Sequence, residues 1–344
     1  MKLYRLLSYI TATIAILVVI YTAYWFIVAD QILDSISMWK VEGVSKNTRL
    51  ETMAVKKSGY PFSINILMDN YKVTNSTSRW SLDGKGVEAS LRPWNLNNIN
   101  IRFIGQNSLQ YFDGNDIQDI KMHIGDGSAA IHITNQDQID RLFINFSNID
   151  IATISSANST RIDNLKLEIF SLPGEKSDQS NVSTVKLELT EFSPPGDFAY
   201  EMGGLIESIS FNIDVYRFNV FKNEKISIAE WRDDGGIAEI KAFEMRWGPL
   251  GLKTIGTVSL DQKMRPIGAL TADIIGYGDV IDALIMSNMI PLGDAFIAKV
   301  AFNMLAEKPV DGGPPVLRAI PVTIQDGQLF IDTVSFAKVR PLQF

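Results

Sequence analysis

The sequence predicts a mainly β protein: one or more antiparallel, curved meander sheets with one N-terminal transmembrane helix and a short helix pair near the C-terminus. Three observations predict it. The chain opens with a long uncharged run, apolar and polar residues then alternate with a period of two, and six Asp-Gly pairs lie among the alternating segments. Such alternation with short turns is typical of antiparallel meanders and not of alternating strand–helix units.

The first predicted element is a membrane segment. The 24 residues from Leu6 to Ala29 carry no charge. As a helix they extend about 36 Å, which is enough to cross a hydrocarbon core of about 30 Å. Tyr21, Tyr24, Trp25 and Phe26 near its end form the aromatic belt that is expected at a membrane–water interface.

The charges that flank this segment predict its orientation. Two basic residues precede it and two aspartates follow it, so the positive-inside rule places residues 1–5 in the cytoplasm and the rest of the chain across the membrane. A cleaved signal peptide is the alternative, but bulky residues stand where small residues should mark its cleavage site. We therefore expect an uncleaved signal anchor at 6–29, followed by a juxtamembrane helix at 30–45.

Residues 46–344 are expected to form an extracytoplasmic β-rich domain. The alternation is clear in several segments: 63–68, 98–103, 142–146, 185–189, 211–215 and 243–247. Paired prolines at 194 and 195 disfavour regular structure, so residues 193–197 are a candidate boundary between two halves. Gly174 to Ser183 is predicted to be a solvated loop.

One Asp-Gly pair predicts a hairpin in register. With its turn at Asp126-Gly127, the segment from Ile120 to Ile133 separates into an apolar face and a face that carries His123 and His132. Two neighbouring histidines raise the question of a metal site. A third ligand and a recognised ligand spacing are both missing, so no metal site is predicted.

Two helices are predicted before the last strands, at 279–289 and 294–305. The second is apolar nearly all round, which is typical of a helix that is buried or faces an apolar ligand. We expect Phe296, Val300 and Met304 on this helix to help line a groove. Trp80, Trp94, Trp231 and Trp247 are further candidates for its lining, because binding grooves are rich in aromatic side chains.

Composition excludes several classes of function. The chain has 344 residues, no cysteine, two histidines and a net charge of −7, which excludes disulfide scaffolds and thiolate metal sites and argues against a nucleic-acid partner. No nucleotide-binding or nucleophile motif is present, and we predict no cofactor and no catalytic residue. The missing cysteine favours a bacterial periplasm over a eukaryotic secretory route.

Short motifs give the chain a family resemblance. Ser58-Gly59-Tyr60-Pro61-Phe62 follows the anchor, and Arg92-Pro93-Trp94-Asn95-Leu96 and Ile324-Gln325-Asp326-Gly327-Gln328-Leu329 come later. With these residues the chain resembles, over nearly its whole length, the alphaproteobacterial envelope family catalogued as domain of unknown function 2125. Gly256–Leu260, Pro266–Gly268 and the helix pair are also similar to AsmA-like envelope proteins. The latter resemblance implies an anchored β-sheet curled into an apolar groove, associated with lipid movement or outer-membrane assembly, and it implies no catalytic residue.

The sequence therefore predicts a protein that binds a ligand and is not an enzyme. We expect a single-pass protein of the bacterial inner membrane whose periplasmic sheet binds apolar ligands, foremost lipid. The alternative is an envelope scaffold that recruits other proteins by strand addition. A hydrolase that uses scattered acidic residues comes third, since it would need a converging set of carboxylates.

Overall fold

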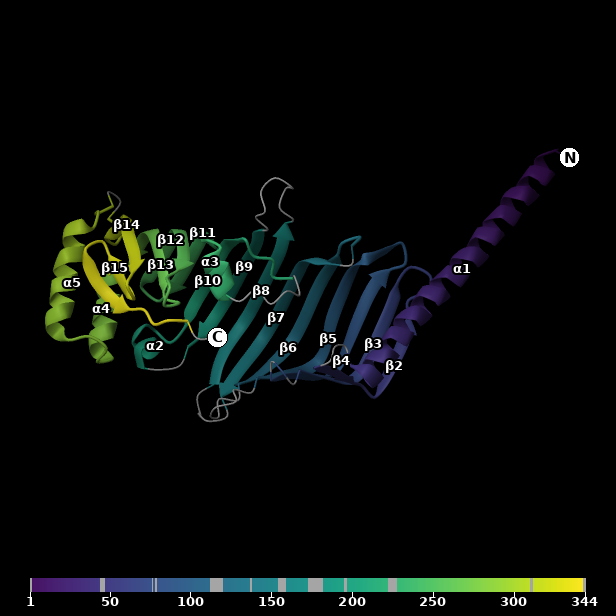
Figure 1. Cartoon of the computed structure of the whole chain (residues 1–344), viewed down its shortest axis with the longest axis horizontal. Coiled ribbons are helices and arrows are strands. Elements are labelled where there is room, and N and C mark those ends of the chain that lie inside the picture. The colour runs from purple at the N-terminus through teal and green to yellow at the C-terminus, as the bar shows by residue number, and fades with distance from the viewer. Residues whose placement is uncertain are drawn as a thin grey trace. The chain divides into compact units, whose positions relative to one another are not determined.

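The computed structural model describes residues 2–43, 47–75, 77, 79–111, 120–136, 138–153, 159–172, 182–194, 197–221, 228–309 and 312–342. As predicted, it is mainly antiparallel β-sheet with a long N-terminal helix and a few short helices (Figure 1). The chain divides into two compact units, Met1–His132 and nearly all residues from Ile133 onward. Residues 193–197, the candidate boundary, fall within the second unit. Most of the predicted loop at 174–183 lies outside the described residues, but Val182 and Ser183 belong to a strand.

The described residues of the first unit form one helix and six strands. The strand order is β1-β3-β4-β5-β6, every neighbouring pair is antiparallel, and β2 also pairs with β3. The elements are α1 (Lys2–Glu42), β1 (Thr48–Glu51), β2 (Ala54–Ser58), β3 (Ile64–Asn75), β4 (Trp80–Arg92), β5 (Asn95–Tyr111) and β6 (Ile120–Ile133).

Helix α1 is continuous through the predicted anchor and the predicted juxtamembrane helix. It contains no Gly or Pro to interrupt it, and it ends just before Gly43, whose positive φ of 85° is typical of the residue that follows a helix C-terminus. The stretch Leu6–Glu42 is the one helix in the described part of the chain that is long and apolar enough to cross a membrane. Its N-terminal half projects away from the strands in Figure 1, and its apolar side chains up to Ile20 are exposed.

The second half of α1 packs on the first unit. Trp25, Ala29 and Ile36 are buried against residues of β1, β3 and β4, chiefly Leu50, Ile64, Ile66 and Leu91. Trp25 is therefore only 2% exposed and is part of a protein core. The sequence predicts Trp25 in the aromatic belt of a membrane–water interface, and the structure adds that the alternation of β3 supplies an apolar stripe that covers its ring.

The second unit is a meander with a helix at several of its connections. Its strands pair in the order of the chain from β7 to β16. The elements are β7 (Ile139–Thr153), β8 (Ser159–Leu172), β9 (Val182–Ser193), α2 (Asp197–Glu201), β10 (Ile206–Tyr216), α3 (Ile228–Asp233), β11 (Ala238–Trp247), β12 (Leu250–Leu260), β13 (Pro266–Ile275), α4 (Tyr277–Met286), α5 (Leu292–Leu305), β14 (Val316–Gln325), β15 (Gln328–Ile331) and β16 (Val334–Lys338).

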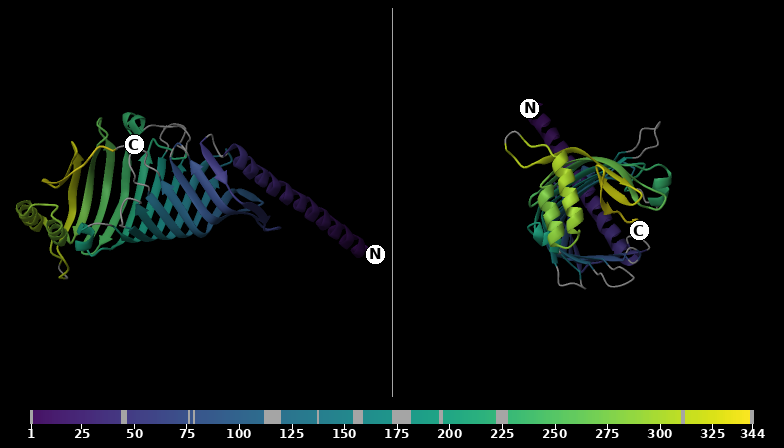
Figure 2. Two further views of the ribbon diagram at one scale, coloured as in Figure 1. Left: turned by 90° about the horizontal axis from the view of Figure 1, so that it is seen from below. Right: turned by 90° about the vertical axis from the view of Figure 1, so that its left-hand side faces the viewer.

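The predicted helix pair is confirmed as α4 and α5, which lie side by side in Figure 2. Tyr277 and Ile281 of α4 and Ala295 and Phe302 of α5 are buried on the last strands of the second unit. Tyr277 and Phe302 meet edge to face with ring centroids 5.9 Å apart, a favoured aromatic geometry. This helix pair covers β13, β14 and β15.

The Asp-Gly pairs predict turns with mixed success. Asp326-Gly327 forms the tight turn between β14 and β15, with φ of 53° and 75°. The prediction is wrong at Asp83-Gly84, which lies inside β4. Gly84 is required there for a packing reason, because a Cβ on it would stand 2.1 Å from Asn107 Oδ1 and 2.8 Å from the Tyr71 ring. The pairs at Asp113 and Asp311 include residues outside those described.

The hairpin predicted at Asp126-Gly127 is also wrong. β6 runs through this pair as one strand and is bonded to β5 on both sides of a bulge. Pairing with the long β5 gives this segment more ladder hydrogen bonds than folding back on itself would. The predicted division into faces still holds, since Met122 and Ile131 lie opposite apolar residues of β5.

Candidate functional site

An apolar face extends over the strands of the second unit. The pairing of β7 to β14 aligns three rows of side chains across the strands, and we call these rows the apolar face. They are Ile144-Leu167-Leu187-Phe211-Phe243-Thr254-Ala272-Ile320, Phe146-Leu165-Leu189-Ile209-Met245-Leu252-Ile274-Leu317 and Leu142-Ile169-Val185-Ile213-Ile240-Gly256-Leu270-Val322. Nearly every member is apolar because each strand alternates in the same phase.

The burial of the apolar face changes along the sheet. On β13 and β14 it is largely covered by α4 and α5, and Ala272, Leu317, Ile320 and Val322 are buried. From β7 to β12 every member of the three rows is only half-buried. Full burial of a Leu, Ile or Phe side chain stabilises by about 1.5–3 kcal/mol, so these six strands leave part of that stabilisation unrealised. An apolar ligand on this face would recover it.

The opposite face of the same strands is charged. Lys166 pairs with Glu188 at 3.5 Å, Lys186 with Glu168 at 3.7 Å, and Lys253 with Glu244 at 3.4 Å. These side chains are well exposed, so each pair contributes little to stability. The contrast shows that the half-buried rows differ chemically from an ordinary solvated sheet face.

A cavity of about 310 Å³ lies beside α3 on the apolar side of the second unit. Its lining is almost wholly apolar and comprises Val215, Phe218, Ile228, Trp231, Ala238, Val258, Ser259, Leu260, Pro266 and Leu342. The size is at the lower end of the range for small-molecule sites. The Trp231 indole is buried and its Nε1 donates a 2.8 Å hydrogen bond to the carbonyl oxygen of Tyr216, which fixes the ring at the cavity.

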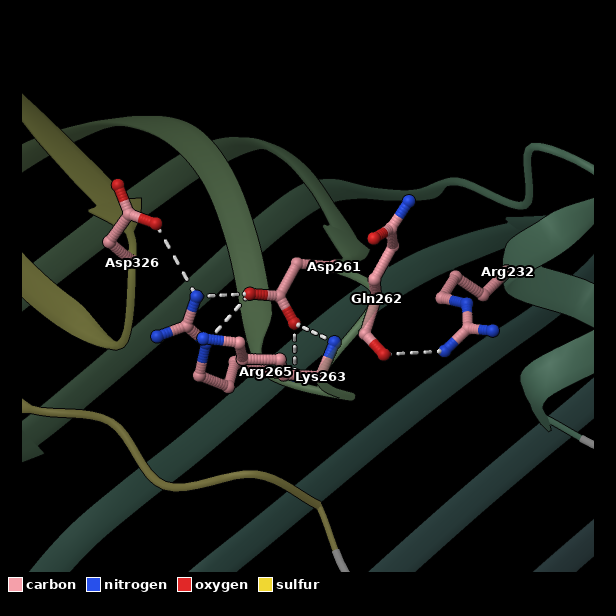
Figure 3. Close-up of polar contacts among 6 residues, drawn as sticks. All are labelled: Arg232, Asp261, Gln262, Lys263, Arg265 and Asp326. Atoms are coloured by element: carbon pink, nitrogen blue, oxygen red, sulfur yellow. Dashed lines mark hydrogen bonds and ion pairs between the residues drawn. The ribbon is translucent and has the colours of Figure 1, made fainter.

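A polar network holds the strand turns beside this cavity (Figure 3). In the turn between β12 and β13, Asp261 accepts hydrogen bonds from the backbone N–H groups of Lys263 and Arg265 at 2.8 and 2.9 Å. The Arg265 guanidinium bonds the same carboxylate at 2.6 Å and reaches Asp326 at 3.4 Å. Arg232 of α3 bonds the carbonyl oxygen of Gln262 at 3.3 Å. The network thus joins α3 and two hairpin turns.

The electrostatics of Asp261 agree with a structural role. Desolvation acts to raise the pKa of the Asp261 carboxyl. It is outweighed by the hydrogen bonds from Arg265 and from the Lys263 N–H, together with the positive charge of Arg265. The pKa of Asp261 is therefore below its usual value. The same contacts raise the pKa of the Arg265 guanidinium, through the hydrogen bond to Asp261 above all. Both groups therefore stay charged at neutral pH, as an ion pair that fixes a turn requires.

The first unit has an apolar face of the same kind. Its rows cross β3 to β6 and include Ile66-Ala89-Ile101-Ala129, Met68-Val87-Phe103-Gly127 and Val73-Leu82-Leu109-Met122. One polar pair interrupts it, where the Tyr71 hydroxyl donates a 2.9 Å hydrogen bond to Asn107 Oδ1. Burial raises the pKa of Tyr71 strongly, and the nearby Asp83 adds to the shift.

The predicted groove residues occupy different places. In the first unit, Trp80 is half-buried in the Asn75-Trp80-Tyr111 row, whereas Trp94 is exposed at the turn between β4 and β5. In the second unit, Trp231 lines the cavity, and Trp247 at the end of β11 meets Phe198 edge to face at 5.3 Å.

The three groove candidates on α5 lie on its outer side. Phe296, Val300 and Met304 are exposed, whereas Ala295 and Phe302 face the strands. The residues that fill the apolar face, such as Leu187 and Phe211, were visible in the sequence only as strand alternation. Most residues of this face are aliphatic, so aromatic side chains alone do not identify it.

The two histidines lie far apart. Because β6 is one strand and not a hairpin, His123 and His132 are separated by nine residues of extended chain, about 30 Å. They cannot share one metal ion. Among the residues that the structure describes, no group of three or more histidine, aspartate and glutamate side chains is arranged to hold a metal.

The fold and the apolar faces define a class: an antiparallel β protein with an N-terminal helix fit to span a membrane and a broad apolar sheet surface. The chain belongs to the family described as "Uncharacterized protein conserved in bacteria (DUF2125)", whose model matches residues 25–340. This confirms the resemblance to domain of unknown function 2125, whereas the similarity to AsmA-like envelope proteins stays a prediction. No curated protein and no solved structure is significantly similar to the chain.

Proposed function

We propose that this protein is a single-pass protein of the bacterial inner membrane whose periplasmic strands bind the acyl chains of lipids and catalyse no reaction. One observation carries the proposal: the apolar face of the second unit is half-buried on six successive strands. Soluble proteins rarely leave a contiguous apolar surface of that extent in contact with water unless it binds something.

Two further features support a lipid as the ligand. The N-terminal helix is apolar over a bilayer's thickness, and a helix of this kind supports an anchor that would keep the chain next to a source of lipid. Its basic start and acidic continuation favour a cytoplasmic N-terminus and a periplasmic body. The three rows of the apolar face contain no charged side chain. This face therefore suits an acyl chain and not a lipid headgroup.

The experiment uses the alternation of one strand as its own control. A photo-crosslinking benzophenone amino acid is placed at Phe211 on the apolar face, or at the adjacent Asn212 on the opposite face, of the full chain in membranes with radioactive phospholipid. We expect lipid adducts at 211 and none at 212. Leu187 and Glu188 on β9 form a second pair with the same expectation. Equal labelling of both members in both pairs, or no lipid at either apolar position, would contradict the proposal.

A second candidate function rests on a different surface. Helix α5 exposes Leu292, Phe296, Ile297, Val300 and Met304, and an apolar helix face of this kind is a common docking site for another protein. This favours the envelope-scaffold alternative. The same benzophenone residue at Phe296 distinguishes the two: a protein adduct of defined mass supports the scaffold, and its absence leaves lipid binding as the sole proposal.

A further inference from the structure

Two strand turns of the first unit are bonded to the middle of α1. One is the turn from Gly59 to Ser63 between β2 and β3, and the other holds Pro93 and Trp94 between β4 and β5. Thr22 Oγ1 lies 2.7 Å from the Tyr60 hydroxyl, and Trp25 Nε1 donates a 2.9 Å hydrogen bond to the carbonyl oxygen of Ser63.

Two tyrosines of α1 add to these contacts. The hydroxyl of Tyr21 donates to the carbonyl oxygen of Pro61, and that of Tyr24 donates to the carbonyl oxygen of Pro93 at 2.7 Å. Aromatic contacts strengthen the attachment of the turns to α1. The ring centroid of Tyr60 lies 5.5 Å from that of Trp25 and 6.0 Å from that of Phe26. Both turns are therefore held at a fixed level along the helix.

With α1 across a bilayer from Leu6 onward, that level falls at the end of the hydrocarbon core. Counted from Leu6, the first residue of the uncharged run, 20 helical residues span about 30 Å and reach Trp25. The helix positions that bond the turns, 21 to 25, thus coincide with the membrane–water interface on the side of the strands. The next charged pair, Lys57 with Asp30, lies just beyond this level.

The turns expose large apolar side chains at this level. Phe62 is 75% exposed and Trp94 is 61% exposed, and Tyr60 is also exposed, as is Leu96 at the start of the adjoining β5. No charged residue occurs in either turn, although Lys57 and Arg92 flank them. Aromatic side chains on an uncharged turn with basic residues beside it are the composition that favours the interfacial region of a phospholipid bilayer.

We propose that these two turns are a second membrane contact, with Phe62 and Trp94 inserted into the interface of the bilayer that α1 crosses. The occupant is the glycerol and upper acyl region of the phospholipids, because the turns are bonded to the anchor at the depth of that region. The contact sets the angle of the first unit to the membrane. It rests on the membrane anchor of the proposed function but is independent of lipid binding by the apolar faces.

The absence of cysteine makes a site-specific test direct. Single-cysteine variants F62C and W94C of the full chain carry an environment-sensitive fluorophore and are placed in phosphatidylcholine–phosphatidylglycerol nanodiscs. V41C is the matched control, since Val41 is 86% exposed on the same helix about 24 Å beyond Trp25. I14C reports on the anchor itself.

We expect lipids with a nitroxide near the headgroup to quench the fluorophore at 62 and 94 several-fold more than at 41, and aqueous iodide to do the reverse. Quenching at 62 and 94 no stronger than at 41 would overturn the membrane contact. Protection from iodide without quenching by lipid would also overturn it and would indicate a protein on the turns. If the fluorophore at 14 escapes quenching by nitroxide deep in the bilayer, the anchor itself is wrong, so the two failures are distinguishable.

Discussion

Trp25 of the N-terminal helix donates a hydrogen bond of 2.9 Å to the carbonyl oxygen of Ser63, the last residue of the turn before β3. The two residues are 38 positions apart, and the indole is buried among residues of three strands. The helix fit to span a membrane is therefore part of the core of the first unit and is not a tether attached to a separately folded domain.

Removing this hydrogen bond should destabilise the first unit. The Trp25→Phe variant retains an aromatic ring but leaves the Ser63 carbonyl without its donor, and we expect a loss of about 1–3 kcal/mol in the free energy of unfolding. Guanidinium unfolding of the full chain in detergent, followed by circular dichroism, measures it. The matched control is Trp39→Phe on the exposed end of the same helix, and an equal loss there would contradict the expectation.

Gly84 should tolerate no side chain. In Gly84→Ala the new Cβ would stand 2.1 Å from Asn107 Oδ1, so either Asn107 or the Tyr71 ring must move and their hydrogen bond must break. We expect a destabilisation of about 1–3 kcal/mol by overpacking. Gly278→Ala in α4 is the control, because a Cβ there meets nothing within 4 Å and alanine favours helix. A harmless Gly84→Ala would show that the Tyr71–Asn107 pair is not fixed.

The turn that Asp261 holds should weaken in acid. The pKa of Asp261 is below its ordinary value in the folded protein, so this group stabilises the fold at neutral pH and loses that effect as the pH falls through the folded pKa. Asp261→Asn should lower the melting temperature at pH 7 and show a smaller further drop between pH 5 and pH 3 than the native chain. Asp233→Asn, on an exposed carboxylate paired with Arg232, is the control. Parallel pH curves for Asp261→Asn and the native chain would contradict the assignment.

Trp231 should be the main support of the cavity beside α3. Trp231→Ala removes a buried ring, and we expect a loss of about 3–5 kcal/mol in the free energy of unfolding. Trp231→Phe keeps most of the ring but loses the hydrogen bond to the Tyr216 carbonyl, so its loss should be nearer 1 kcal/mol. Trp94→Ala at an exposed turn, measured in detergent, should change stability by less than about 0.5 kcal/mol. An equal loss for Trp94→Ala and Trp231→Ala would be inconsistent with this assignment.

The candidate site could be predicted from the sequence in kind but not in position. Alternation at 142–146, 185–189 and 211–215 predicts strands with one apolar face, and the structure aligns Ile144, Leu187 and Phe211 in one row. The seven candidate groove residues did not identify that row. Exposure on α5 depends on which side of the helix meets the strands, and a helix that is apolar nearly all round carries no signal that distinguishes Phe302 from Phe296.

The sequence by itself determined the local elements of this protein: a helix with a long uncharged run and no Gly or Pro, a meander with period two, and a helix pair before the last strands. These follow from properties of neighbouring residues, namely charge, alternation and helix-breaking residues. Only the tertiary structure decided that Asp83-Gly84 and Asp126-Gly127 continue through strands, that Trp25 turns into a protein core, and that the apolar rows stay half-buried from β7 to β12. Each of these depends on a partner distant in the chain, and the free energy of burial is fixed by what lies opposite a side chain and not by its neighbours in sequence.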